Sequence, residues 1–389
     1  MKLKLLLTLL FIPLSINAEI ITDGTLGPNI NLSGPDFFIT EDLGQQQGSN
    51  LFHSFQEFNL QSNEGATFFG PDNIQNIISR VTGGNPSNID GYISSAIPNA
   101  NMYFINPYGI VFGENFKLDV QGGFHASTAD YLRLGAEGKF NTRQPSESLL
   151  TIAPVTAFGF LTDNPAPITI QKPNLYSYGD LSFIGGEINI NGVNGQFPQI
   201  EKEDIVNDNA PTIEDVDFSS SIVNEFGQIK LASINSTGEV IVDDLQLNGT
   251  GGQITINNTQ LYNINYNFLA RANELVLNNS GIFNNQGEHI DIKVNDLYIV
   301  DGIIASGIAK NNSANIDIQA SNSINLQNGN IASIAIDEES RGKGGNININ
   351  TQQLSVTNGS YIMSDSQTGQ SGGNIVIKAD SILIDIFPK

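Results

Sequence analysis

The sequence predicts an all-β protein, a right-handed parallel β-helix (solenoid) with an N-terminal capping region. Three observations carry this prediction: similar units recur in the second half of the chain, apolar and polar residues alternate within each unit, and turn residues separate the short runs. The composition agrees, because 39 of the 389 residues are Gly and only 15% are charged. Glycine is flexible enough for the tight corners between strands.

Four related units follow one another from residue 287. They read GEHIDIKVNDLYIVDGIIAS, SANIDIQASNSINLQNGNIAS, GGNININTQQLSVTNGSYIMS and GGNIVIKADSILI. The first apolar residues of these units are Ile290, Ile316, Ile347 and Ile375, which gives intervals of 26, 31 and 28 residues. A repeat of this length is typical of a solenoid, in which each unit packs only against its neighbours.

Each complete unit contains three short strand-like runs. In the third unit, Ile347 and Ile349 belong to the first run, and Leu354 and Val356 belong to the second. A spacing of two places these apolar side chains on one face of a strand. A turn signal and a third run then follow. Three strands and three corners predict a triangular coil, with turn signals at Asp301-Gly302, Asn328-Gly329 and Asn358-Gly359.

The strands are expected to pair in parallel between coils. No segment with helical periodicity separates them, so crossover helices are not available to build a parallel sheet. Stacking each coil on the previous one buries Ile, Leu and Val in a continuous core, and it places equivalent Asn residues where they can form ladders. A β-sandwich or a propeller is the alternative fold, which the lack of regular hairpin loops disfavours.

Earlier segments fit the same scheme less regularly. The matching runs are GGEINI from Gly185, GQIKLAS from Gly227, GGQITI from Gly251 and NELVLNNSGIF from Asn273. Residues 191–221 form an acidic, Pro-containing stretch that interrupts the pattern. We expect this stretch to be a loop that projects from one corner of a coil.

The charge and the residue types exclude several classes of partner and site. The chain carries 17 Lys and Arg against 40 Asp and Glu, a formal net charge of -23, which argues against nucleic acid as a partner. It has no Cys, which excludes disulfide scaffolds, zinc–thiolate sites and thiol catalysis. We expect no cofactor and no metal site.

Residues 1–18 have the features of a secretory signal peptide. Lys2 and Lys4 precede an apolar run from Leu5 to Ile16, and Ala18 is a small residue at the expected cleavage point. The run is shorter than the roughly 20 residues that a membrane helix needs. We therefore expect export of a mature chain that begins at Glu19; a buried N-terminal strand is the alternative.

Residues 19 to 135 are richer in Phe than the repeats. Such aromatic bulk is expected in a capping region, which closes the end of the core and blocks strand pairing there. This part also contains LFHSFQEFNL (Leu51–Leu60), NIISRVTGG (Asn76–Gly84), GYI (Gly91–Ile93) and MYFINPYGIVFGENFKLDVQGGFHASTADYLRLG (Met102–Gly135), followed by LTIAPVTAFGFL, NPAPI and GQIKLASI. Together these segments resemble the filamentous haemagglutinin-type secretion domain of two-partner secretion exoproteins.

The resemblance covers roughly residues 20 to 240 and implies a route of export. Proteins of that family cross the inner membrane by the Sec route, and a dedicated outer-membrane barrel transporter with POTRA modules recognises their N-terminal β-helical domain. The family's Asn-Pro-Asn-Gly-Ile motif corresponds here to Asn106, Pro107, Gly109 and Ile110, with Tyr108 in the third position. From the residues alone, Asn-Pro-Tyr-Gly is a turn. Two interpretations stay open: the turn contacts the transporter, or it only shapes a corner of the β-helix.

An enzyme is the second functional hypothesis, because β-helices also host carbohydrate-active enzymes. A hydrolase would need paired carboxylates. Asp243 and Asp244 are the only adjacent Asp pair, and neighbours on a strand point to opposite faces. The histidines His53, His125 and His289 show no metal or triad spacing, and His289 is expected to be solvated. We therefore predict no catalytic residues.

The leading functional hypothesis is a secreted or surface-exposed, adhesin-like exoprotein. Its expected domains are the signal peptide (1–18), the secretion domain (19–240) and a β-helix repeat region (241–389). Its expected partners are the transporter and a host-cell or matrix ligand, either protein or glycan. A third hypothesis is a truncated exoprotein without activity of its own, because the chain ends within a repeat at SILIDIFPK.

Overall fold

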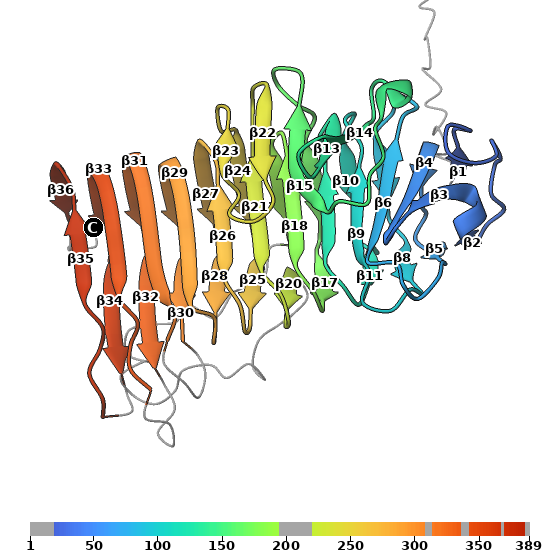
Figure 1. Cartoon of the computed structure of the whole chain (residues 1–389). Coiled ribbons are helices and arrows are strands. Elements are labelled where there is room, and N and C mark those ends of the chain that lie inside the picture. The colour runs from blue at the N-terminus through green and yellow to red at the C-terminus, as the bar shows by residue number, and fades with distance from the viewer. Residues whose placement is uncertain (1–18, 194–219, 308–312, 336–341, 367–368, 386–389) are drawn as a thin grey trace, which may run out of the picture.

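Strands stacked along one axis make up most of the computed structural model, which describes residues 19–193, 220–307, 313–335, 342–366 and 369–385. The predicted signal peptide and residues 194–219 of the predicted acidic loop lie outside the described residues. Figure 1 shows the strands as a rod of successive coils, with β1 near one end and β36 at the other. No helix in the described part is long and apolar enough to cross a membrane.

Equivalent strands of successive coils pair in parallel, in three columns. The first column contains β4 (Asn50–Asn59), β6 (Asn76–Val81), β9 (Asn101–Ile105), β12 (Phe124–Ser127), β18 (Leu181–Gly185), β21 (Ile229–Ser233), β26 (Phe268–Arg271), β29 (His289–Val300), β31 (Asn315–Gln327), β33 (Ile347–Thr357) and β35 (Ile375–Lys378). The second contains β7 (Ser87–Ile89), β10 (Ile110–Phe112), β16 (Ile168–Gln171), β19 (Ile188–Asn191), β24 (Gln253–Asn257), β27 (Glu274–Asn278), the later parts of β29, β31 and β33, and β36 (Ser381–Ile384).

The third column is divided between two sheets. The first sheet contains β2 (Asp36–Ile39), β5 (Gly65–Phe68), β8 (Tyr92–Ser95) and β11 (Lys117–Asp119). The second contains β17 (Asn174–Ser177), β20 (Ser221–Asn224), β25 (Gln260–Asn263), β28 (Gly281–Asn284), β30 (Ile303–Ser306), β32 (Asn330–Ala335) and β34 (Tyr361–Ser366). Three strand positions per coil confirm the predicted parallel β-helix.

The predicted register of the repeats is confirmed. Ile290 pairs with Ile316, Ile316 with Ile347, and Ile347 with Ile375. The first two runs of these units, however, form one bent strand in β29, β31 and β33, because little chain separates them. Ile, Leu, Val and Phe side chains from all three columns form a single buried core cluster that runs through the coils.

The structure has turns at the three predicted corners, but the left-handed residue of each turn is more often Asp or Asn than Gly. At the first two corners, the residues with positive φ are Asp301 (50°) and Asn328 (49°), not the Gly that follows each of them. At the third corner, both Asn358 (55°) and Gly359 (81°) have positive φ. Asn and Asp accept this left-handed conformation more readily than other non-Gly residues.

The predicted asparagine ladders are present. Asn278 Nδ2 donates to Asn257 Oδ1 at 2.9 Å, and Asn257 Nδ2 donates to Asn191 Oδ1 at 2.8 Å. At the neighbouring corner, Asn279 Nδ2 donates to Asn258 Oδ1 at 2.9 Å. These ladders provide the polar side chains with hydrogen-bond partners from coil to coil along the surface of the rod.

The N-terminal cap is real but shorter than predicted. β1 (Glu19–Thr22) and β3 (Gly44–Gln47) pair with β4 in antiparallel fashion, and the 3-10 helix η1 (Glu41–Leu43) precedes β3. Parallel stacking already begins between β4 and β6 in the first column and between β2 and β5 in the third. The aromatic residues that suggested a cap up to residue 135 mostly fill the inside of the first coils, as Phe58 and Phe104 do with ring centroids 4.9 Å apart.

An antiparallel outer layer, which the sequence analysis did not predict, covers part of the first column. It consists of β14 (Gly138–Asn141), β13 (Tyr131–Leu134), β15 (Val155–Phe160), β22 (Gly238–Ile241) and β23 (Leu247–Asn248), with the 3-10 helix η2 (Pro145–Glu147) after β14. A second core cluster fills the space beneath it, where Phe52 packs on Phe140 and Tyr103 lies near Phe158. The layer is inserted after β12 and after β21 without breaking the coil stacking.

Candidate functional site

The predicted motif forms the corner between β9 and β10. Asn106 is fully buried, and its Nδ2 donates to the Asn85 carbonyl and to Ser87 Oγ, both at 3.0 Å. Its Oδ1 accepts a hydrogen bond from the Tyr108 amide at 3.0 Å, which makes an Asx turn. Asn106 therefore closes its own corner and also ties that corner to the preceding coil.

The other motif residues complete the same turn. The Gly109 amide donates to the Asn106 carbonyl at 3.2 Å, and Gly109 has a φ of 120°, which a side chain would strain. Pro107 and Ile110 are buried, whereas Tyr108 is partly exposed, with the Arg143 guanidinium 5.0 Å from its ring centroid. The structure thus brings the four predicted residues together at one corner and presents only the Tyr108 side chain between them to solvent.

A buried arginine network lies near this motif and joins three parts of the molecule. Arg80, in β6, has no exposed surface. Its guanidinium donates to Ser54 Oγ at 2.7 Å in the first coil, to Thr25 Oγ1 at 2.9 Å after β1, and to Ser148 Oγ at 2.7 Å after η2. It also donates to the Asn141 carbonyl and lies 4.3 Å from the Phe140 ring centroid. Arg80 therefore holds the cap, the coils and the outer layer together.

Asp23 supplies the negative charge of this network. Its carboxylate accepts hydrogen bonds from Ser54 Oγ at 2.6 Å, Thr82 Oγ1 at 2.9 Å and the Thr25 amide at 2.9 Å. Although burial opposes it, this set of donors holds the pKa of Asp23 below its usual value. Burial also lowers the pKa of Arg80 to about 10, a change that the charge of Asp23 resists.

A second buried polar cluster lies on the outer face of the first column. The His125 ring stacks on Tyr103 with centroids 4.4 Å apart, and its Nδ1 is 2.9 Å from Ser182 Oγ. Lys230 Nζ lies 3.0 Å from Asp180 Oδ2. Burial lowers the pKa of His125 to about 4; Lys230 contributes in the same direction, and Asp180 opposes it. The neutral ring is therefore the stable form at this position near pH 7.

His53 lies among aromatic rings in β4. Its ring stacks on Phe55 with centroids 6.1 Å apart and meets the edge of Phe68 at 5.5 Å. Burial lowers the pKa of His53 to about 4, against the smaller opposing effect of Leu43 and Asp42. His53 and His125 thus belong to the packed interior and are not presented to a substrate.

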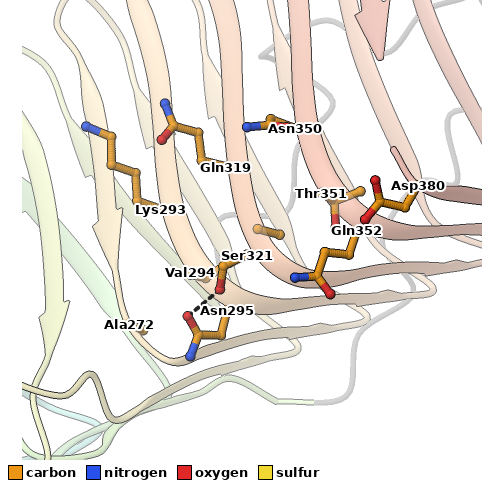
Figure 2. A pocket seen from close by; sticks show the side chains of 11 residues that line it. Ala272, Lys293, Val294, Asn295, Gln319, Ser321, Asn350, Thr351, Gln352 and Asp380 are labelled. Carbon is orange, nitrogen blue, oxygen red and sulfur yellow. Dashed lines mark hydrogen bonds between the residues drawn. The ribbon is translucent and has the colours of Figure 1, made fainter. Parts of the chain in front are cut away.

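The described surface has an open groove along the bend of β29, β31 and β33, with a volume of about 530 Å³. Figure 2 shows Lys293, Gln319 and Asn350 along one side of it, and Asn295, Ser321 and Gln352 along the other. A second hollow of about 480 Å³ is lined by Asn235, Gln253 and Asn273, among others. Ala272 lines the first hollow and its sequence neighbour Asn273 lines the second, so the two hollows lie on adjacent coils.

The residues considered as catalytic candidates in the sequence do not come together in one site. The His289 side chain is 43% exposed, as expected of a solvated residue, and its Nδ1 lies 3.0 Å from Asp317 Oδ2. Asp243 and Asp244 lie in the turn between β22 and β23, and not on a strand as the sequence analysis assumed. Among the residues that the structure describes, there is no group of three or more His, Asp or Glu that could hold a metal ion.

Sequence reasoning missed the Arg80 network and the groove. One signal for Arg80 was available, because a charged residue in the middle of the apolar run IISRV is unusual unless it is paired. The groove had a weaker signal. Asn295, Ser321 and Gln352 occupy the same place between the first and second runs of successive units, where a bend makes their side chains gather.

Comparisons with known proteins give a family and several similar proteins. A family model described as the TPS secretion domain matches residues 18–268 of the chain. A heme/hemopexin-binding protein of Haemophilus influenzae is 32% identical over 87 residues, which are 22% of this chain but only 9% of the length of that protein.

Two solved structures are similar over most of the chain. The HMW1 secretion domain of Haemophilus influenzae has a TM-score of 0.47 and 15% identity, and the match covers 95% of this chain and 97% of that chain. A filamentous hemagglutinin secretion domain has a TM-score of 0.37 and 11% identity, covering 94% of this chain and 99% of that chain. The fold itself rests on the strand pairing described above.

Proposed function

The chain belongs to the TPS secretion domain family, and from this membership we propose that a dedicated outer-membrane barrel transporter recognises residues 19–240 and exports the chain. As a two-partner secretion exoprotein, the chain is secreted across the outer membrane. The further parts of the proposal are a Sec-dependent first step and a transporter that carries POTRA modules. The family match over residues 18–268 is the observation that carries the proposal.

We further propose that the coils of residues 241–389 form an adhesin-like rod that binds a ligand on a host cell or in its matrix. The long series of parallel coils supports this role, because a solenoid presents an extended and regular surface. The open groove on the same coils supports it as well, since it offers room for a partner along the axis.

Export is expected to depend on both the N-terminal domain and the transporter. In a Gram-negative host that expresses the cognate transporter, the tagged full chain should appear outside the cell, where added protease digests it. Without the transporter, or after deletion of residues 19–240, the tag should stay in the periplasm. Equal surface exposure in all three strains would refute transporter-dependent export.

We propose that the transporter recognises the motif corner, and a matched pair of variants tests this. Asn224 is a second fully buried corner asparagine; its Nδ2 donates to the Gly179 carbonyl at 2.6 Å, and its Oδ1 accepts from the Gly227 amide at 2.9 Å. Asn106→Ala and Asn224→Ala should each cost about 1–3 kcal/mol of stability, because each leaves buried groups without a partner.

Secretion should separate the two variants. If the transporter reads the motif, Asn106→Ala lowers the rate of secretion at least tenfold, while Asn224→Ala leaves it within a factor of about two. Pulse-chase labelling of the extracellular chain measures the rates, and urea unfolding of the purified chains checks that the stabilities match. An equal effect of both substitutions on secretion would mean that Asn106 acts only through folding.

A further inference from the structure

The groove along β29, β31 and β33 has a regular construction. Three residues with small or branched side chains, Ala272, Val294 and Ala320, lie at the bend and pack into the core cluster. Because their side chains point inward, the bend leaves a concave strip on the outside. On either side of the bend, the neighbouring side chains point outward and form two walls (Figure 2).

Each wall carries polar side chains in equivalent positions from coil to coil. On one wall, Lys293 is in register with Gln319, and Gln319 is in register with Asn350. On the other wall, Asn295 Nδ2 donates to Asn273 Oδ1 at 2.6 Å, and Ser321 Oγ donates to Asn295 Oδ1 at 2.6 Å. These contacts orient the amides but use only part of their capacity, since each amide has two donor hydrogens and two acceptor lone pairs.

The middle of the groove carries no charge. Between Lys293 at one end and Asp380 at the other, the lining side chains are Asn295, Gln319, Ser321, Asn350, Thr351 and Gln352. This neutrality stands out in a chain with a formal net charge of -23. An anionic ligand would be repelled by the whole molecule, and a cationic ligand would find no carboxylate in the middle of the groove.

We propose that this groove binds an extended, uncharged polysaccharide that lies along the axis of the rod. Parallel coils repeat every 4.8 Å or so, which is close to the length of one sugar unit in an extended chain. The coils of β31 and β33 then each offer one amide or hydroxyl side chain from either wall to the hydroxyl groups of one sugar. This inference rests on the proposed adhesin-like function and names the class of ligand that the rod would bind.

Affinity electrophoresis of the purified mature chain tests the proposal without any export step. Native gels that contain galactomannan, xyloglucan or hydroxyethyl cellulose present extended neutral chains, while dextran presents a flexible one. We expect at least one of the three extended polymers to retard the protein, and dextran to have no effect. Retardation should persist at about 0.5 M salt, where charge interactions are screened.

Two groove variants and one control locate the site. Ser321→Leu places bulk between the walls at an exposed position, and it should raise the dissociation constant at least tenfold. The double variant Gln319→Ala with Asn350→Ala should raise it by about thirtyfold, because two amide contacts to the sugar chain are lost together. Ser62→Leu, at an exposed turn after β4, is the matched control and should bind like the original chain.

Several results would overturn the proposal. The first is a lack of retardation by all three extended polymers, and the second is unchanged binding by Ser321→Leu with an unchanged unfolding midpoint. Retardation by gelatin alone would instead indicate a peptide ligand and would also refute a polysaccharide. Failure here combined with transporter-dependent export would leave the secretion role intact, because the two experiments have separate readouts.

Discussion

Replacing Arg80 by Met is expected to lower the free energy of unfolding by about 3–5 kcal/mol, because the substitution leaves the buried Ser54, the buried carbonyl of Asn141 and the half-buried carboxylate of Asp23 without their cation. Ser54, Thr25, Ser148 and the Asn141 carbonyl would each lose a charged donor. Met fills similar space, so the loss would come from the polar contacts. Urea unfolding of the purified chain, followed by tyrosine fluorescence, measures the change.

Arg133→Met provides the matched control. Arg133 lies in the outer layer with its side chain 35% exposed, and its Nη1 pairs with Glu239 Oε2 at 2.8 Å. An ion pair that water reaches is worth less than about 1 kcal/mol, so this variant should stay close to the original stability. If Arg80→Met costs no more than Arg133→Met, then Arg80 does not hold the cap, the coils and the outer layer together.

The coils could be predicted because their information is local and repeated. Ile290, Ile316 and Ile347 occupy the same place in successive units, and a solenoid pairs exactly such equivalent positions. The alternation of apolar and polar residues then decides which side chains face the core. Corner residues such as Asn328 could be located for the same reason, even though the sequence did not show which residue of each pair is left-handed.

The outer layer and the Arg80 network could not be predicted in this way. Arg80 contacts residues near positions 25, 54, 141 and 148, and periodicity says nothing about pairs so far apart. β15 and β22 pair across about 80 residues that also contain complete strands of the coils. The motif corner could be predicted only in part. The turn from Asn106 to Gly109 could be predicted from the sequence, whereas the burial of Asn106 could not.

Acid is expected to destabilise the protein between about pH 6.5 and pH 4 through two buried histidines. Burial lowers the pKa of both His53 and His125 to about 4, while an unfolded histidine has a pKa near 6.5. Between these values the unfolded chain binds more protons than the folded chain, so the free energy of unfolding falls as the pH falls. Each histidine should cost about 2 kcal/mol at pH 5 relative to pH 8.

Urea unfolding at pH 8, 6 and 5 measures this dependence, and substitution assigns it. His125→Gln keeps a polar group near Ser182 but does not titrate, so the difference between pH 8 and pH 5 should shrink by about 2 kcal/mol. The matched control is His289→Gln, because the His289 side chain is 43% exposed on the outer face of the coils. An equal change of the pH dependence in both variants would contradict the assignment to the buried ring. A weaker pH dependence in His125→Gln, but not in His289→Gln, would show that the buried cluster around His125 makes folding sensitive to acid.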